Sequence, residues 1–500
     1  MDQELNEQVK YLSKSLFIRG LKCHKALYLQ KFRPDLKEEI SEELQRRFDT
    51  GYAVGSLALD LFPGGAMVPY EGLSHAEQLD MTQTLIRQGA DTIYEATFSH
   101  DDVFVKVDIL HRGDNGWEIY EVKASSSMKD YHVNDLSVQY YVIAGTGLPI
   151  VRACLVHINK HYVRQGDIES GKLFTIVDLT ETAKDKEPFI RDEIQKQRFM
   201  LSSGEPTIEI GPQCSKPFEC DFVGHCWAHI TSPSVFDFMD KGKPDSFSLY
   251  RQGIIKMADV SPDLLGWRQQ LQLEGLLHQK NYLDVDAVKA FVDSLWYPLC
   301  FMDFETTFMT PIPMYDGIRP YQQVPFQYSL HVIHEPGGAL GHHEFLADGA
   351  ANPQKEFLEK LLAIIPRNAC ILVWNQGFEI PRLEELAETF PDKSGKIDHL
   401  ISNIRDLMIP FRDKSIYHWQ FNGSYSIKVV LPALLPELTY DNLEINDGGM
   451  AASAWVRMIQ SNDEEEISAI RKELLQYCHL DTLAMVKILE KMHTQSHNGG

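Results

Sequence analysis

The sequence lacks several features that would assign a class directly. No apolar run reaches the roughly 20 residues that a membrane-spanning helix needs, and there is no internal repeat or low-complexity segment. The first ten residues are polar and acidic, without the basic and then apolar pattern of a secretory signal. We therefore expect a cytoplasmic protein without membrane contact, whose eight cysteines are thiols or metal ligands rather than disulfides.

Positive charge is also scarce. The chain has 48 Lys and Arg against 71 Asp and Glu, which gives a formal net charge of −23. This balance argues against a general nucleic-acid binder, but it does not exclude a nuclease, because carboxylates that hold cations count as negative in the tally. Residues 14–37 are locally basic, and this segment is either a phosphate-contacting surface or a solvated helix face.

The length indicates more than one domain, because 500 residues exceed one ordinary hydrophobic core. Residues 1–231 mix helices with a central group of strands and end in a cysteine-rich stretch. Residues 232–294 contain amphipathic runs and are expected to form a helical connector. A second α/β region is expected over residues 295–500.

A pair of carboxylates follows an apolar run in this second region. The run YPLCFMDFETTF, residues 297–308, predicts a buried strand that ends near Asp303 and Glu305. Residues two apart share a strand face, so both carboxylates point into one space. At about 4 Å and an effective dielectric near 20, two such charges repel by roughly 4 kcal/mol. A divalent cation such as Mg²⁺, which also accepts phosphate oxygens, offsets this repulsion.

Other acidic residues stand in the elements expected after this strand. Glu379 lies at the start of a predicted helix, where the helix dipole favours a carboxylate. Tyr477 and Asp481 are four residues apart, so they share one face of a predicted C-terminal helix. Asp406 lies on another apolar run and is a candidate for support of the same site.

These motifs together resemble the DnaQ-like, or DEDD, exonucleases of the RNase H-like fold. That family carries D-x-E on its first strand, an N-x-x-F-D type motif and a closing Y-x-x-x-D. The counterparts are DFE at 303–305, NQGFE at 375–379 and YCHLD at 477–481, which correspond to the tyrosine subtype. Glu379 departs from the family, which usually has Asp there, but the longer side chain still permits contact with a second metal ion or with water.

The resemblance implies an RNase H-like mixed-sheet domain over residues 295–500 that trims 3′ ends with two cations, Mg²⁺ or Mn²⁺. By the same resemblance, Asp303, Glu305 and Asp481 are metal ligands, and Tyr477 orients the attacking water. The alternative is an ion cluster at a strand end beside a packed tyrosine.

A β-hairpin is predicted in the N-terminal region, over residues 101–127, where two alternating strands flank GDNG. A two-residue loop at 114–115 places Asp108 opposite Glu121, and a loop one residue later places Asp108 opposite Lys123. In either register the three side chains share one face. Two acids and a lysine can bind a cation through Asp108 and Glu121 and steady a scissile phosphate.

The hairpin resembles the core of the PD-(D/E)xK nucleases, with VDIL and EVK as the D…ExK motif. Gln139 and Tyr140 match the helix that follows in RecB-type members, and Glu95 precedes the hairpin as an acidic residue does in many of these enzymes. Leu59 stands where RecB-type nucleases often carry a metal-binding histidine. The resemblance implies a restriction-endonuclease-like domain, either an active nuclease or a degenerate fold kept for substrate binding.

Four cysteines support the same resemblance. Cys23 is isolated, whereas Cys214, Cys220 and Cys226 follow with five residues between each. Four thiolates can hold either a 4Fe-4S cluster or zinc. One early cysteine and three late ones resemble the iron–sulfur RecB-like nucleases, including those associated with CRISPR spacer acquisition, and this resemblance implies the 4Fe-4S cluster. The alternative, buried apolar cysteines, suits the remaining four: Cys154, Cys300, Cys370 and Cys478.

The two halves together resemble a bacterial family of unknown function that fuses a RecB-like nuclease to a DnaQ-like exonuclease, and the stretch 425–443 shares that resemblance without an assigned chemistry. We therefore expect a metal-dependent nuclease that trims DNA 3′ ends, in defence or repair. One alternative is an exoribonuclease with an RNA-binding N-terminal domain. The other is a non-catalytic iron–sulfur protein that binds nucleic acid. The sequence leaves any protein partners unknown.

Overall fold

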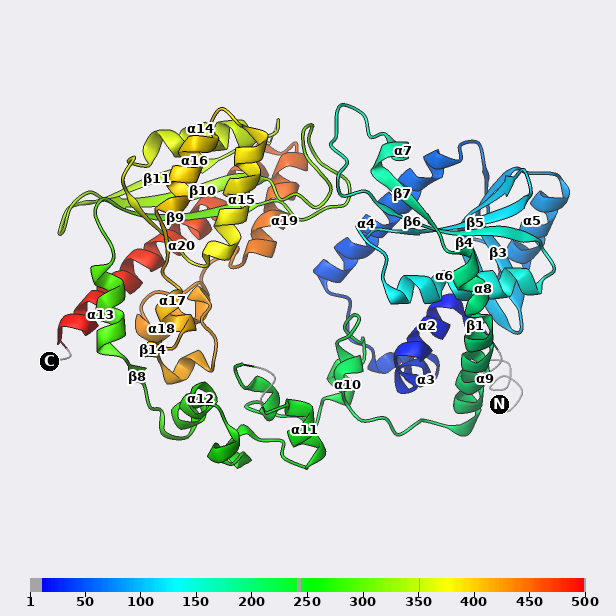
Figure 1. Ribbon diagram of the computed structural model, residues 1–500, viewed down its shortest axis with the longest axis horizontal. Coiled ribbons are helices and arrows are strands. Elements are labelled where there is room, and N and C mark those ends of the chain that lie inside the picture. The colour runs from blue at the N-terminus through cyan, green and yellow to red at the C-terminus, as the bar shows by residue number, and fades with distance from the viewer. Residues whose placement is uncertain (1–10, 241–243, 350, 499–500) are drawn as a thin grey trace. The chain divides into compact units, whose positions relative to one another are not determined.

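The computed structural model describes residues 11–240, 244–349 and 351–498. The polar first ten residues, on which the expectation about a secretory signal rests, lie outside this range. Figure 1 shows the course of the chain. The fold is α/β with mixed sheets, as expected from the sequence. Among the described residues, no helix combines the length and apolar character needed to cross a bilayer.

The chain forms two compact units. Unit 1 comprises residues 1–229 and 310–321, and unit 2 comprises residues 230–309 and 322–500. The first boundary lies two residues from the one expected at 231. The expected connector groups with unit 2, and the short segment 310–321 groups with unit 1. There, Arg164 donates hydrogen bonds to the carbonyl oxygens of Pro313 and Met314, at 3.0 and 2.9 Å.

Unit 1 is built on a mixed sheet. Its described strands run in the order β2-β3-β4-β5-β6-β7, with β1 beside β4. The strands are β1 (Leu12–Ser13), β2 (Ala66–Met67), β3 (Thr92–His100), β4 (Val103–Gly113), β5 (Gly116–Lys123), β6 (Ile150–Ile158) and β7 (Phe174–Asp178). Strands β3, β4 and β5 are antiparallel, whereas β5 and β6 are parallel.

The β4–β5 hairpin has the first of the two predicted registers. Gly113 pairs with Gly116, and Ile109 pairs with Tyr120. Residues 114–115 are therefore the two-residue loop, and continuing the register places Asp108 opposite Glu121.

Helices cover both faces of this sheet. Helix α6 packs against β3, β4 and β6, and α4 packs against β5. The described α-helices of unit 1 are α2 (Lys14–Lys22), α3 (His24–Phe32), α4 (Glu42–Ala58), α5 (His75–Arg87), α6 (Asp130–Gly145), α7 (Ser170–Leu173), α8 (Thr180–Asp185), α9 (Glu187–Ser203) and α10 (Val223–Cys226).

Unit 2 contains a second mixed sheet, whose described strands run in the order β11-β10-β9-β12-β13. These strands are β9 (Leu299–Thr306), β10 (Pro325–Ile333), β11 (Leu340–Leu346), β12 (Cys370–Val373) and β13 (Ile404–Asp406). A small ladder joins β8 (Tyr282–Leu283) to β14 (Ile416–Tyr417). Strand β9 is antiparallel to β10 and parallel to β12, so it lies in the middle of the sheet.

The two faces of this sheet carry different helices (Figure 1). Phe304 and Tyr328 contact Phe357 of α14, so these side chains point to one face. Gln327 donates a 2.7 Å hydrogen bond to the Leu474 carbonyl of α20, so its side chain points to the other face. The described α-helices of unit 2 are α11 (Ser246–Arg251), α12 (Trp267–His278), α13 (Val285–Asp293), α14 (Gln354–Ile364), α15 (Gln376–Thr389), α16 (Ser394–Ser402), α17 (Ile409–Arg412), α18 (Ile427–Leu434), α19 (Gly448–Gln460) and α20 (Glu464–Asn498).

Candidate active site

Three carboxylates come together where strand β9 packs against helix α20. We call them the unit 2 carboxylate cluster. Asp303 and Glu305 alternate with Phe304 along β9, so they leave the sheet on the face opposite α14. Asp481 comes from α20. One ligand oxygen from each of the three lies within 4.8 Å of the others. Asp481 and Glu305 are only 6% and 8% exposed, so little water shields their charges.

The protein environment disfavours ionisation of this cluster. Burial raises the pKa of Asp303 to about 6. Burial, and then the charge of Asp303, raise the pKa of Asp481 to about 8. Burial and both neighbouring carboxylates raise the pKa of Glu305 well above its usual value. A bound cation would reverse these shifts, because it favours the charged form of each group.

Glu379 approaches the cluster from the first turn of α15. Its side chain is 1% exposed, and its Oε2 atom has no hydrogen-bond partner among the described residues. Burial, and then the charge of Asp303, raise its pKa well above the usual value. Glu379 lies outside the group of three within 4.8 Å. An unpartnered buried oxygen close enough to feel the charge of Asp303 fits a second cation or a water bound to one.

Two tyrosines and a lysine surround the cluster. Tyr440 donates a 2.7 Å hydrogen bond to Asp481 Oδ1. Lys428 Nζ donates to the Tyr477 hydroxyl at 3.1 Å. Burial, and then Asp481 and Glu305, raise the pKa of Tyr477, so its hydroxyl stays protonated and can orient water rather than act as a base. Sequence reasoning missed Lys428 and Tyr440, although both lie in the stretch 425–443 that had no assigned chemistry.

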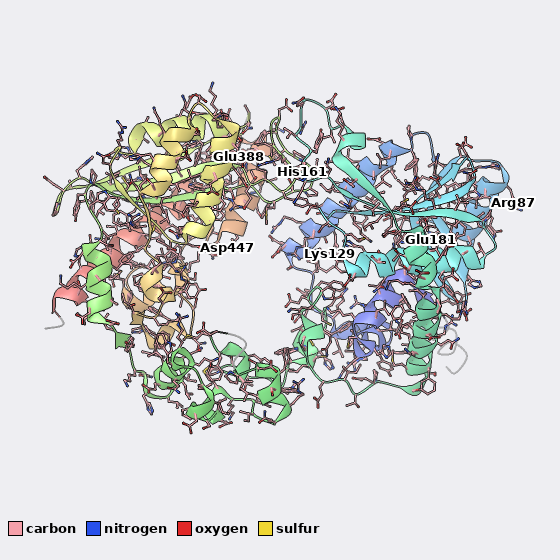
Figure 2. The ribbon with its side chains drawn as sticks, viewed as in Figure 1. Arg87, Lys129, His161, Glu181, Glu388 and Asp447 are labelled. Carbon is pink, nitrogen blue, oxygen red and sulfur yellow. The ribbon has the colours of Figure 1, made fainter. Side chains whose placement is uncertain are left out.

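Helix α19 begins beside the cluster. Asp447, labelled in Figure 2, caps this helix by accepting a 2.7 Å hydrogen bond from the Met450 amide. A Cβ atom on Gly448 would lie 3.3 Å from Glu305 Oε2. The small residue therefore lets the first turn of α19 approach Glu305, and the amide groups of such a turn favour a nearby anion.

Asp406 supports the site indirectly. It ends β13, and its Oδ1 atom accepts hydrogen bonds from the amides of Asn375 and Met408, at 3.1 and 3.0 Å. Asn375 has left-handed backbone geometry, with φ of 84°, immediately before α15. Asp406 therefore fixes the turn that starts the helix carrying Glu379, and it is not a member of the carboxylate cluster.

A second polar centre lies in unit 1. It contains the carboxylates of Asp108, Glu121 and Asp135 and the ammonium groups of Lys14 and Lys123, which we call the unit 1 ion-pair cluster. Lys123 contacts Glu121 Oε1 at 2.5 Å and also pairs with Asp135. Lys14 Nζ lies 2.8 Å from Glu121 Oε1. The structure thus brings together the Asp108, Glu121 and Lys123 set expected from the hairpin.

The acids of this cluster differ in how far neighbouring lysines compensate their charge. Burial alone would raise the pKa of Glu121, but Lys123 and Lys14 lower it below its usual value. Burial and the Glu121 charge raise the pKa of Asp108 to about 8, and Asp108 accepts a 2.6 Å hydrogen bond from the Val122 amide. Each acid therefore has a protein partner in the metal-free state.

The other residues predicted for this centre divide into two groups. Gln139 joins it by donating a 2.5 Å hydrogen bond to Glu121 Oε2. Glu95 lies nearby with a left-handed φ of 54°, a rare conformation that often occurs at functional sites. Tyr140 instead packs in the core on the side of α8. Leu59 packs against the apolar cluster that contains Tyr120, so it supplies no ligand.

Sequence reasoning missed Lys14 and Asp135 as members of this cluster. Asp135 precedes Gln139 by four residues on α6, and this spacing places both on one helix face. Lys14 belongs to the basic segment 14–37, in which several cations have protein partners. Arg19 and Lys37 each pair with Asp221 at 2.9 Å. The prediction that this segment contacts phosphates stays a prediction.

The four predicted cysteine ligands converge in unit 1. Cys23 lies between α2 and α3, and the other three lie between residues 212 and 226; all four line one cavity. Burial raises the pKa of Cys220 and of Cys226, and the neighbouring cysteines raise both further. No three of these sulfur atoms form a group within 4.8 Å of one another in the described chain. They are therefore neighbours, but more widely spaced than the carboxylates.

Comparisons with known proteins give limited information. Residues 300–426 match the model of a "Domain of unknown function (DUF2779)". This segment contains Asp303, Glu305 and Glu379 but ends before Tyr477 and Asp481. A curated relative, "Uncharacterized protein MG366 homolog" of Mycoplasma pneumoniae, is 26% identical over 218 residues, and the match covers 39% of this chain and 32% of the relative. The chain thus spans about a third of that relative's length.

Proposed function

We propose that unit 2 is a divalent-metal-dependent 3′→5′ exonuclease with a DnaQ-like, tyrosine-subtype active site in an RNase H-like domain. The observation that carries this proposal is the unit 2 carboxylate cluster, in which the buried Glu305 and Asp481 and the partly buried Asp303 converge within 4.8 Å beside the Tyr477 hydroxyl. Burial raises the pKa of all three acids, and neighbouring carboxylates raise those of Glu305 and Asp481 further, whereas a structural ion cluster would be expected to pair the acids with cations from the protein.

The residues would divide the work in hydrolysis as follows. Asp303, Glu305 and Asp481 would hold Mg²⁺ or Mn²⁺, and Glu379 would contribute its unpartnered oxygen directly or through water. Such cations would supply a lowered pKa of the attacking water and stabilisation of the in-line displacement. Tyr477, held by Lys428 at 3.1 Å, orients the attacking water with its protonated hydroxyl.

For unit 1 we propose a RecB-like, PD-(D/E)xK-type domain that binds or cleaves the same DNA. The convergence of Asp108, Glu121, Lys123 and Gln139 on one sheet face supports it. Lys14 and Lys123 already neutralise Glu121, so cation binding there requires a lysine to turn away from this acid. A DNA-binding or weakly cleaving role therefore suits unit 1 better than the main catalytic role.

The four cysteines line one cavity, so they can act together as ligands of one cluster or one ion. The resemblance of their pattern to the iron–sulfur RecB-like nucleases favours a 4Fe-4S cluster over zinc.

The experiment is a degradation assay on 5′-labelled and 3′-labelled single strands of DNA and of RNA with Mg²⁺ or Mn²⁺. We expect the full-length chain to release 3′-terminal nucleotides from DNA and to leave a ladder on the 5′-labelled strand. Asp303→Asn should remove this activity, and the exposed variant Asp413→Asn is the matched control.

Three outcomes decide between the alternatives. Equal degradation by wild type and Asp303→Asn would contradict the exonuclease proposal. Faster loss of RNA than of DNA would favour an exoribonuclease, for which contact with the 2′-hydroxyl would be responsible. Tight binding of nucleic acid without turnover under any divalent cation would favour the non-catalytic alternative.

A further inference from the structure

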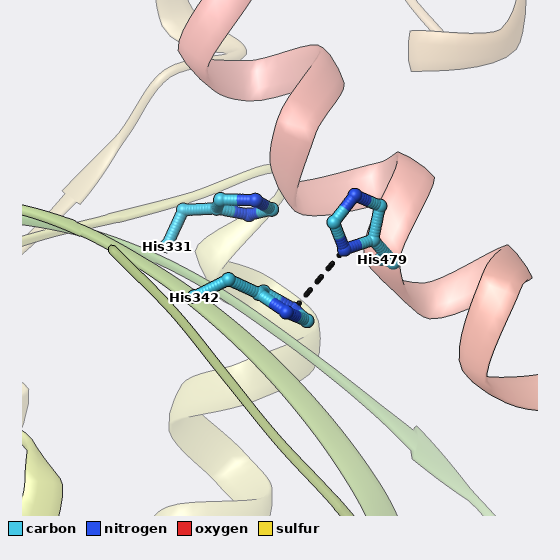
Figure 3. A group of neighbouring side chains, drawn as sticks. All are labelled: His331, His342 and His479. Carbon is cyan, nitrogen blue, oxygen red and sulfur yellow. Dashed lines mark hydrogen bonds between the residues drawn. The ribbon is translucent and has the colours of Figure 1, made fainter. Parts of the chain in front are cut away.

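Three histidines from separate elements of unit 2 meet on the α20 side of the sheet, and we call them the histidine triad. His331 lies on β10 and His342 on β11, and they are direct cross-strand partners. His479 projects from α20 toward both, as Figure 3 shows. One ring nitrogen from each lies within 4.8 Å of the others. Alternation along the strands and the position of one helix residue thus aim three imidazoles at one point.

The spacing of the ring nitrogens suits a small cation. His479 Nδ1 lies 3.2 Å from His342 Nε2. A tetrahedral zinc ion with Zn–N bonds of 2.0–2.1 Å holds its nitrogen ligands about 3.3 Å apart. The hydrogen-bonded pair of nitrogens therefore has nearly the separation that zinc requires, and a nitrogen of His331 lies within 4.8 Å of both.

Neighbouring hydroxyls orient the rings. Thr482 Oγ1 lies 2.8 Å from His331 Nδ1, so the Nε2 atom of His331 remains for a cation. Ser329 Oγ lies 3.0 Å from His342 Nε2, the same nitrogen that His479 approaches. A ring nitrogen offers one proton or one lone pair, so two polar partners compete for it. The Thr482 hydroxyl, on the ring nitrogen of His331 that is not the proposed ligand, is the kind of partner that fixes ring orientation around metal-binding histidines. A cation at His342 Nε2 would take the place of the Ser329 contact.

One ring of the triad is accessible from solvent. His479 lines a surface hollow of about 770 Å³ together with Glu344, so an ion can reach this ring from solvent.

We propose that the histidine triad is a Zn²⁺ site that fastens α20 to β10 and β11. Imidazole nitrogen favours zinc and similar transition metals, whereas the carboxylate cluster favours Mg²⁺ or Mn²⁺. Water or Glu344, which is two residues from His342 on the same strand face, would complete the coordination. His479 is two residues from both Tyr477 and Asp481, so the site would hold the helix that carries them.

The test uses full-length, cluster-loaded protein stripped of loosely bound metal and titrated with Zn²⁺, and with Co²⁺ as a spectroscopic probe, in excess Mg²⁺. We expect one equivalent bound, a cobalt spectrum without thiolate charge transfer, and a higher unfolding temperature. His342→Gln should weaken binding more than about 100-fold, beyond the loss expected for a residue that only orients a ligand. His343→Gln, on the opposite and exposed face of β11, is the matched control and should bind like wild type.

The wild-type measurement decides the question even if His342→Gln fails to fold. X-ray absorption of the zinc-loaded wild-type chain should show three imidazole ligands. No Zn²⁺ bound in excess Mg²⁺, fewer than two imidazole ligands, or equal affinity in His342→Gln and His343→Gln would overturn the proposal. The inference does not rest on the exonuclease: Asp303→Asn should lose hydrolysis and keep the zinc equivalent.

Discussion

Two groups of three carboxylates, one in each unit and each partly buried, differ in how their charge is balanced. In unit 1, Lys14 and Lys123 pair with Glu121 and Asp135 at distances of 3.8 Å or less. In unit 2, the lysine next to the carboxylate cluster, Lys428, donates to the Tyr477 hydroxyl. The first group is neutralised by the protein itself, whereas the second needs protons or bound cations.

The difference shows that acidic residues in a motif do not by themselves make an equivalent metal site. Lys123 and Lys14 lower the pKa of Glu121, so its carboxylate is charged and already paired with these lysines. The pKa of Glu305 is raised by burial and by Asp303 and Asp481, so its ionisation requires a cation. A cation added to the whole protein should therefore bind unit 2 first, because no protein ion pair has to break there.

The largest expected effect that tests this comparison is on the rate of hydrolysis. Asp481→Asn should lower the exonuclease rate about 10²–10³-fold, the range for loss of one preorganised electrostatic group. Asp135→Asn in unit 1 should keep most of the 3′→5′ rate, because Asp135 belongs to the other centre. The rate at which each variant degrades a 5′-labelled DNA strand measures both effects. A larger loss in Asp135→Asn than in Asp481→Asn would place the main active site in unit 1.

The next effect concerns the tyrosine that distinguishes the unit 2 site. Tyr477→Phe removes the hydroxyl that would orient water but leaves the three carboxylates in place. We expect kcat to fall about 10- to 100-fold, as for loss of a group that orients a metal-site ligand, with Mn²⁺ affinity unchanged. Single-turnover kinetics measure the rate and a Mn²⁺ titration measures the affinity, so the two effects are separated. A weakened Mn²⁺ affinity with unchanged kcat would contradict the assigned role.

A smaller effect tests charge balance in unit 1. Lys123→Met leaves Asp135 and Glu121 with fewer partners, and Glu121 is 1% exposed. The free energy of unfolding should fall by about 1–3 kcal/mol, the usual range for a buried polar group that loses a partner. Urea unfolding followed by a probe in unit 1 measures it, with the exposed variant Lys184→Met as control. Unchanged stability would mean that the ion pairs contribute little.

The last prediction concerns how the stability of the metal-free protein changes per pH unit. Asp481 holds its proton up to a pKa of about 8 in the folded chain, whereas an unfolded Asp ionises near 4. Between these values the folded state binds more protons, so metal-free stability should fall as pH rises, by no more than about 1.4 kcal/mol per pH unit for each carboxyl. Below pH 4 this contribution is complete.

Asp481→Asn, which cannot ionise, provides the comparison for this pH dependence. Its metal-free unfolding temperature should fall less between pH 4 and 8 than that of wild type. Mg²⁺ or Mn²⁺ should stabilise wild type more at pH 8 than at pH 5. Identical pH profiles for the two metal-free proteins would show that the Asp481 pKa is not raised.

The sequence predicted the parts of the site that depend on local periodicity. Alternation along β9 placed Asp303 and Glu305 on one face, and the spacing of four placed Tyr477 beside Asp481. The hairpin signal identified β4 and β5 but left two registers open, because the loop residues allowed either. The observed pairing of Gly113 with Gly116 resolved them.

Contacts between distant segments could not be predicted from local patterns. Lys14 reaches Glu121 across 107 residues, and Lys428 reaches Tyr477 across 49. The histidine triad joins β10, β11 and α20, and no single stretch of sequence carries its spacing. Gln139 and Tyr140 were both predicted for the site by resemblance to RecB-type nucleases. Consecutive helix residues point in different directions, and of these two only Gln139 contacts Glu121.

The central claim is that divalent cations bind the unit 2 carboxylate cluster, and a Mn²⁺ titration of the full-length chain tests it most directly. Binding should be tightest in wild type and in Asp108→Asn, and should be strongly weakened in Asp303→Asn. Mn²⁺ prefers oxygen ligands, so the cysteines and histidines should not compete. Binding that survives in Asp303→Asn and disappears in Asp108→Asn would contradict the account.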